Sequence, residues 1–189
     1  MGSDLGTHTL NVDASRQRCN RFRRRILEIS QQVQALHIGS AYSCTEIVDC
    51  IYFELMKRDS LGQFNDTFLI SKGHGCMIQY VILEDLGLLS RADLDSYCTK
   101  NGRLGCHPDI GNPGVVASTG ALGHGLSMSL GMAYAERSRG SRGVVYCVLS
   151  DGELQEGRRL DPQLVDRREQ GAAHHHEDRD DGRPASGHP

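Results

Sequence analysis

Three short loops in this 189-residue chain place polar side chains beside glycines at the ends of apolar segments. The first loop, residues 71–75, holds His74 between two glycines, after an apolar run and before a predicted helix. Glycine lets the backbone approach a ligand closely. The start of a helix offers unpaired N–H groups and a positive dipole end to an anion. The loop therefore predicts an anion site at His74.

The second loop, residues 118–125, also opens a predicted helix, and the third, residues 150–153, follows an apolar run of strand type. Ligands of open α/β sheets bind at the carboxyl ends of the strands. An aspartate at that edge, here Asp151 beside Gly152, can hold a hard cation such as Mg²⁺ against a diphosphate. Each pattern alone is more often an ordinary turn. Their co-occurrence, with His37 and His107 in further glycine- or proline-flanked breaks, favours a shared site.

The segments between these loops alternate between helical and strand patterns. Apolar residues at spacings of three and four predict helices over residues 13–36, 45–56, 77–87 and 91–98, and a fifth with Leu122, Leu126, Leu130 and Ala133 on one stripe. Residues 67–70 and 144–149 are typical of strands, the second buried on both faces. Alternation of this kind predicts an α/β domain with a mostly parallel sheet. We expect the three histidines, Gly120 and Asp151 to converge on one edge of that sheet.

Composition excludes several classes of protein. The formal net charge of -3 gives no indication of a nucleic-acid surface or of binding to an anionic membrane. The sequence shows neither a signal peptide nor an apolar run of about 18 residues. Its seven cysteines are scattered without a CxxC pair, which favours reduced thiols in a cytoplasmic protein over a zinc site or a disulfide framework.

The last part of the chain has a different composition from the rest. Residues 158–189 contain three large aliphatic side chains, and the segment is crowded with Arg, Asp and His. Segments of this kind lack the apolar surface that folding requires. We therefore divide the chain into a truncated domain, residues 1–157, and a disordered segment, residues 158–189, which we interpret as a frameshifted or foreign extension.

Residues 36–157 resemble the N-terminal, diphosphate-binding half of transketolases, most of all the N-terminal subunit of two-subunit transketolases. Five motifs occur in the family's order and spacing: residues 37–40, 66–75, 105–108, 118–125 and 150–157. The resemblance implies the α/β thiamine-diphosphate-binding fold, in incomplete form. It further implies transfer of a two-carbon ketol unit between sugar phosphates, with thiamine diphosphate and Mg²⁺ (or Ca²⁺ or Mn²⁺) as cofactors.

Site residues follow from the resemblance, position by position. His37 and His107 match catalytic histidines beside the reacting substrate, and Asp151 matches the first metal ligand. The positions that match cofactor-binding residues are His74, Gly120, Ala121, Leu122, Gly152 and Glu156. The resemblance also implies a partner: a C-terminal transketolase subunit or domain that carries the pyrimidine-binding site, in a dimer of such pairs.

The chain departs from the family pattern at several positions. Leu36, His124 and Ser150 stand where Gly, Gln and Gly are common in the family. The Asn that completes the family's metal site would fall at Asp181, inside the charged segment, so Asp151 is the one metal ligand that the resemblance supplies. We therefore expect the chain alone to be inactive and to bind the cofactor very weakly or not at all.

Two alternatives stay open. One is another thiamine diphosphate enzyme, such as a deoxyxylulose-phosphate synthase or the first component of a dehydrogenase. The other is a non-catalytic truncated product that still associates with a partner subunit. His37, His107 and the loop 118–125 favour the transketolase type among the enzymes.

Overall fold

The computed structural model describes residues 11–33 and 36–155. Glu156 and the predicted segment 158–189 lie outside these residues. The helices are α1 (Val12–Ser30), α2 (Ile38–Tyr42), α3 (Thr45–Cys50), α4 (Met77–Asp85), α5 (Arg91–Asp95) and α6 (His124–Ser138). The strands are β1 (Thr67–Ile70) and β2 (Val145–Val148), and short helical turns cover η1 (Ile51–Leu55), η2 (Gly73–Gly75) and η3 (Gly152–Gln155).

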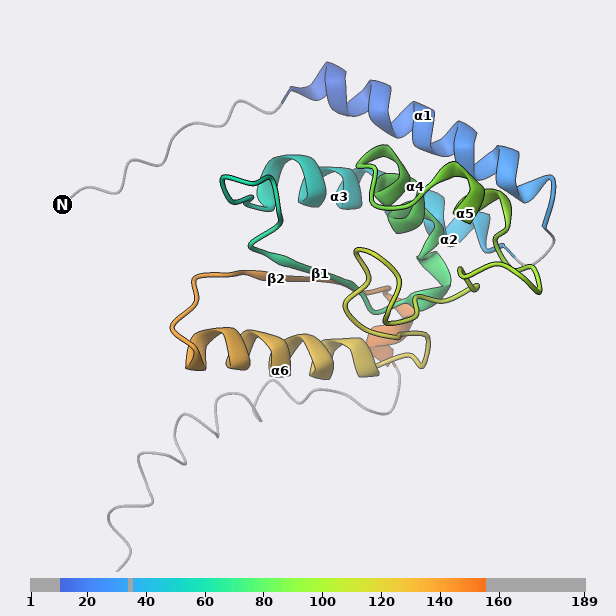
Figure 1. The fold of residues 1–189 in the computed structure, drawn as a ribbon. Helices are drawn as coiled ribbons and strands as arrows, with labels where there is room; N and C mark the ends of the chain where they lie inside the picture. Colours follow the sequence, from blue (N-terminus) through green and yellow to red (C-terminus); the bar gives the residue numbers. More distant parts are fainter. Residues whose placement is uncertain (1–10, 34–35, 156–189) are drawn as a thin grey trace, which may run out of the picture. The chain divides into compact units, whose positions relative to one another are not determined.

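The two strands form a parallel pair in the middle of the described fold. Thr67 lies opposite Val145, and Ile70 lies opposite Val148. Helix α6 covers one face of the pair, and α3 and α4 lie on the other side, with α1 beyond them (Figure 1). This is an incomplete α/β fold, as the sequence predicts. Because the strands are parallel, both of their carboxyl ends open onto the same edge.

Helix α4 is the centre of the hydrophobic core. All of its residues from Met77 to Leu83 are buried, because α1, α2, α3 and α5 pack around it. The predicted helix over residues 45–56 contributes the face with Val48, Tyr52 and Met56. That segment is not one α-helix: α3 ends at Cys50 and continues as the π-helical turn η1, so Met56 has an extended backbone.

Buried ion pairs fix α1 to this core. Arg18 forms a two-point contact with Asp49, with Nε–Oδ1 and Nη2–Oδ2 distances of 2.7 and 3.0 Å. Further along α1, Arg25 binds Glu84 of α4 at 2.9 Å and Asp95 of α5 at 2.8 Å. Planar guanidinium groups suit such paired contacts. They hold α3, α4 and α5 against α1.

Two predicted helices are shorter than the periodicity indicated. Helix α1 ends at Ser30 and not at Leu36; the Ser30 hydroxyl donates to the Leu27 carbonyl in the last turn. Helix α5 starts after Ser90 with the predicted capping box but ends at Asp95. The chain turns away at Cys98, which has a φ of 53° and donates its N–H to the Leu104 carbonyl.

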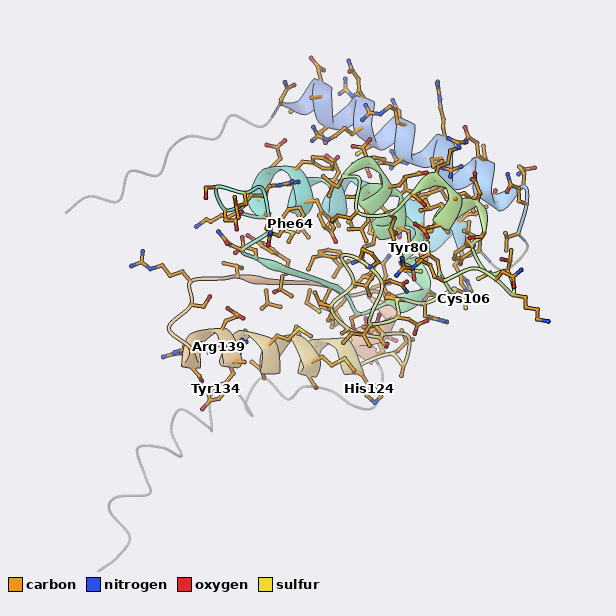
Figure 2. The ribbon with its side chains drawn as sticks, in the orientation of Figure 1. Phe64, Tyr80, Cys106, His124, Tyr134 and Arg139 are labelled. Atoms are coloured by element: carbon orange, nitrogen blue, oxygen red, sulfur yellow. The ribbon has the colours of Figure 1, made fainter. Side chains whose placement is uncertain are left out.

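The prediction for the buried face of α6 was wrong. The helix begins at His124, so Leu122 precedes it, and Leu130 is exposed. Its buried residues are instead Gly125 and Ser129. Small residues allow the helix to lie close to β1, since a Cβ on Gly125 would clash with the Ser71 side chain. Figure 2 shows Tyr134 on the side of α6 that faces away from the strands.

Burial of β2 also differs from the prediction. Val148 is buried, but Val145, Tyr146 and Cys147 are half-buried. Among the described residues β2 pairs with β1 alone, so its other edge is uncovered there. No helix in the described ranges is long and apolar enough to span a bilayer.

Candidate functional site

The loops that follow β1 and precede α6 are in direct backbone contact. The Thr119 hydroxyl donates to the Ile70 carbonyl at 2.7 Å, at the end of β1. A Cβ added to Gly73 would lie 2.7 Å from the Thr119 carbonyl oxygen and 2.8 Å from the Gly120 α-carbon. A side chain at position 73 would therefore separate the loops, which explains the glycine before His74.

His37 and His74 meet at this junction. Their ring centroids are 5.5 Å apart and the rings are nearly perpendicular. His37 immediately precedes α2, and the ammonium of the buried Lys72 holds this helix in place. Lys72 Nζ donates to the Ser40 carbonyl at 2.9 Å and to the Ser43 hydroxyl at 3.1 Å. Two segments far apart in the sequence thus present one imidazole each to the same space.

The third histidine, His107, is held both at its backbone and at its ring. The Tyr80 hydroxyl of α4 donates to the His107 carbonyl at 2.9 Å. Burial raises the pKa of Tyr80, so the phenol keeps its proton for this bond. On the ring, Nδ1 lies 3.3 Å from the Cys106 sulfur. The other side of the ring packs on Gly120, whose φ is 143°.

The environment of His74 favours the neutral form of its imidazole. Burial lowers the pKa of its imidazole below the ordinary value of 6.5, because the charged form loses solvation. The neighbouring His37, Lys72 and His107 lower the pKa further, and Glu153 partly opposes them. The same positive environment favours binding of an anion, which would in turn raise the pKa of His74.

The turn after β2 completes the junction. Asp151 and Gly152 are exposed on it, and the space where a Cβ of Gly152 would stand is open, so a ligand can approach this backbone. Glu153 is buried at 3% exposure, and its carboxylate accepts from the Ser71 hydroxyl and from the Gly123 N–H. These bonds join the turn to the end of β1 and to the start of α6.

The predicted convergence is therefore present for most of the named residues. His37, His74, His107 and Gly120 lie together, and Asp151 and Gly152 are joined to them through the turn that Glu153 anchors. Ala121 and Leu122 continue from Gly120 into α6, and the Ala121 carbonyl accepts the His124 N–H at 3.3 Å. Glu156 lies outside the described residues.

Sequence reasoning missed two buried charged residues, Lys72 and Glu153. Both belong to motifs that the sequence singled out, but charged residues are usually exposed, so nothing in the sequence marked them as buried. The signal that was available is position: each lies within two residues of a predicted site residue, His74 or Asp151.

The described residues supply only part of a binding site for a divalent cation. Residues 11–33 and 36–155 contain no group of three or more His, Cys, Asp or Glu side chains that could hold a metal ion. Hard cations take about six or more oxygen ligands. Asp151 could supply one, so the described residues alone do not fit a complete Mg²⁺ site. They do fit a diphosphate, because His37 and His74 meet beside the end of β1 and the turn after β2 offers open glycine backbone at Gly152.

Comparison with known proteins agrees with this geometry. The sequence profile of the family described as "Transketolase, thiamine diphosphate binding domain" matches residues 15–163. The chain belongs to the transketolase family. A curated relative, one of the subunits of apulose-4-phosphate transketolase of Phocaeicola vulgatus, is 36% identical over 151 residues, which cover 78% of this chain and 54% of the relative. Human transketolase is 32% identical over 150 residues, covering 77% of this chain and 24% of that enzyme.

A solved structure supports the same assignment. Transketolase from Leishmania mexicana superposes with a TM-score of 0.68 at 29% identity, over 76% of this chain and 24% of that protein. The transketolase-family chain thus spans about half the length of the Phocaeicola vulgatus relative and about a quarter of the longer transketolases.

Proposed function

We propose that this chain is the N-terminal part of a transketolase-like enzyme that transfers a two-carbon ketol unit between sugar phosphates with thiamine diphosphate. The observation that supports this most directly is the meeting of His37, His74, His107 and Gly120 at the carboxyl ends of two parallel strands. The family description names the cofactor. The described residues fit its diphosphate group.

Each residue has a distinct part in this proposal. When bound, the cofactor supplies the electron sink for carbanion chemistry. His74 donates a hydrogen bond to the diphosphate, and the Gly152 N–H and the backbone from Gly120 to Leu122 line the cofactor. His37 and His107 bind substrate hydroxyl groups and move protons at the reacting carbons. Asp151 contributes one ligand to Mg²⁺, or to Ca²⁺ or Mn²⁺.

A partner is part of the proposal. The apulose-4-phosphate transketolase relatives are named as one subunit of their enzyme, which supports a second subunit that completes the site. We propose a C-terminal transketolase subunit or domain that carries the pyrimidine-binding site, in a dimer of such pairs. All seven cysteines are unpaired thiols in the structure, which fits a reducing, cytoplasmic location.

The alternative is a non-catalytic truncated product that associates with a partner. The incomplete metal site within residues 11–33 and 36–155 favours it. The division into a domain of residues 1–157 and a non-homologous segment, residues 158–189, also remains a proposal.

Two measurements separate the enzymatic proposal from this alternative. Calorimetry of the full chain with thiamine diphosphate and Mg²⁺ should show no binding of micromolar affinity. A micromolar Kd would correspond to a binding free energy of about −8 kcal/mol. Co-expression with the C-terminal subunit of a two-subunit transketolase should restore cofactor binding and ketol transfer. A stable complex that binds no cofactor would contradict the enzymatic proposal and support the non-catalytic one. Micromolar binding by the chain alone would show that it needs no partner for the cofactor.

A further inference from the structure

We propose that Glu153 is a positioning residue that holds the three cofactor loops in one arrangement. Its Oε1 atom accepts from the Ser71 hydroxyl and, at 2.9 Å, from the Gly123 N–H. The Oε2 atom lies 3.4 Å from the Ser150 nitrogen, and the Ser150 hydroxyl accepts the Glu153 N–H at 3.2 Å. The cofactor part of this inference rests on the proposed function, whereas the joining of the loops does not.

The environment of this carboxylate is unusual for a buried acid. Glu153 is 3% exposed, and its hydrogen-bond donors are a hydroxyl and two backbone N–H groups, all of them neutral. A buried charge is costly unless it is fully hydrogen-bonded. Lys72, a buried cation among the described residues, is engaged by Ser40 and Ser43 instead. The Glu153 carboxylate is therefore stabilised by backbone and hydroxyl donors, and the same hydrogen bonds fix the positions of those donors.

Each donor belongs to a loop that carries a residue assigned to the cofactor or to its metal ion. Ser71 begins the loop that carries His74, Gly123 follows directly on Leu122, and Ser150 precedes Asp151. The Gly123 bond also fixes the backbone at the start of α6, where that residue has a φ of 81°. Loss of the carboxylate would remove the hydrogen bonds that join the turn after β2 to the other two loops, although none of the assigned residues would have changed.

Asp66 provides a matched control at the opposite end of the strands. It is also a buried carboxylate, 5% exposed. Its Oδ2 accepts the Lys57 N–H and its Oδ1 accepts the Val144 N–H, each at 2.8 Å. Asp66 thus joins the starts of β1 and β2 as Glu153 joins their ends. Its loss should destabilise the fold without reaching the site.

Hydrogen exchange of the full chain tests the joining role. We expect Glu153→Ala to raise amide exchange at least about tenfold, or about 1.4 kcal/mol of local stability, in residues 118–126 and 150–155. Glu153→Gln should recover most of the protection, because its amide oxygen can replace Oε1. Asp66→Ala should raise exchange near residues 57–67 and 144 instead. Unchanged exchange in Glu153→Ala, or a uniform rise that matches Asp66→Ala, would contradict the inference.

A second measurement addresses the cofactor. Millimolar thiamine diphosphate with Mg²⁺ is titrated into the full chain while the ring signals of His37, His74 and His107 are followed by NMR. The wild-type and Asp66→Ala chains should show weak, saturable shifts, and Glu153→Ala should lose them. Shifts retained in Glu153→Ala would overturn the positioning role. Absence of shifts in the wild-type chain would overturn diphosphate binding by this chain alone, and a cofactor role of Glu153 in the isolated chain with it, while the exchange pattern still decides the joining role.

Discussion

The ring of His107 lies on the α-carbon of Gly120. A Cβ at position 120 would stand 2.7 Å from His107 Cδ2 and 3.0 Å from Cγ. Tyr80 fixes the backbone of His107 from beneath, so the ring has little room to retreat. The loop predicted to contact substrate and the loop predicted to line the cofactor are therefore in van der Waals contact through these two residues.

Gly120→Ala should disturb both loops. At a φ of 143° an L-residue is strained, and the added methyl group also meets the His107 ring. We expect a loss of about 1–3 kcal/mol in the free energy of unfolding and a changed His107 ring signal. Urea unfolding and NMR measure the two effects.

Gly131→Ala is the matched control for this variant. Gly131 lies within α6, and among the described residues no atom from outside its own helical turn stands within 4 Å of its would-be Cβ. Alanine there should stabilise the helix by about 0.5–1 kcal/mol and leave His107 unchanged. If Gly120→Ala lowered the free energy of unfolding no more than this variant does, the close contact between Gly120 and His107 would not contribute to stability.

The neutral state of His74 should appear in the pH dependence of stability. Its pKa is lowered in the folded protein, so the unfolded chain takes up a proton first as the pH falls below about 6.5. The stability contribution is complete above that pH and is lost as the pH falls toward the folded pKa. Unfolding free energies at about pH 7.5 and pH 5.5 should therefore differ less in His74→Gln than in the wild type. An equal or larger acid loss in His74→Gln would contradict the lowered pKa.

Sequence patterns predicted the meeting of the polar loops because much of its geometry is local. Residues 67–70 form β1 as predicted, and each polar loop follows a strand or opens a helix, so strand direction alone places the loops at one edge. The capping box at Ser90 and Asp93 was also readable, since it depends on residues three apart. Such features need no knowledge of tertiary packing.

The features that sequence did not reveal depend on packing between distant segments. The leucines of α6 predicted the wrong buried face, because close approach to Ser71 favours Gly125 and Ser129 over larger side chains. Glu153 is buried because three donors from separate loops converge on it. Neither fact follows from local propensity or from hydrophobic periodicity.

Tyr80→Phe should affect the position of His107 although it replaces none of the proposed site residues. The substitution removes the hydrogen bond to the His107 carbonyl, at a cost of about 0.5–1.5 kcal/mol. Tyr52→Phe is the control, since the buried Tyr52 hydroxyl accepts from Gln79 Nε2 at 3.2 Å within the core. Both variants should lose similar stability in urea. The His107 ring signal should shift in Tyr80→Phe alone, and a shift of equal size in Tyr52→Phe would point to general loosening of the core.

His74 and His107 should fail in different ways in a complex reconstituted with a C-terminal transketolase subunit. In the proposed function His74 contacts the diphosphate before any reaction, so His74→Ala should weaken cofactor binding about tenfold or more, a change of about 1.4 kcal/mol. His107 lies against Gly120, and we propose that it contacts the reacting substrate. Contacts made only in the transition state appear in turnover. His107→Ala should therefore lower kcat while leaving the cofactor affinity nearly unchanged.

Calorimetry and steady-state kinetics at saturating cofactor separate these effects. Excess thiamine diphosphate should restore much of the turnover of His74→Ala, because its defect is in binding. The same excess should leave His107→Ala slow. His107→Gln, which keeps a hydrogen-bond donor but has no ring to exchange a proton near neutral pH, distinguishes binding from proton transfer in the second residue. A pure affinity loss shared by both alanine variants would show that the histidines belong to one binding surface and have no division of roles.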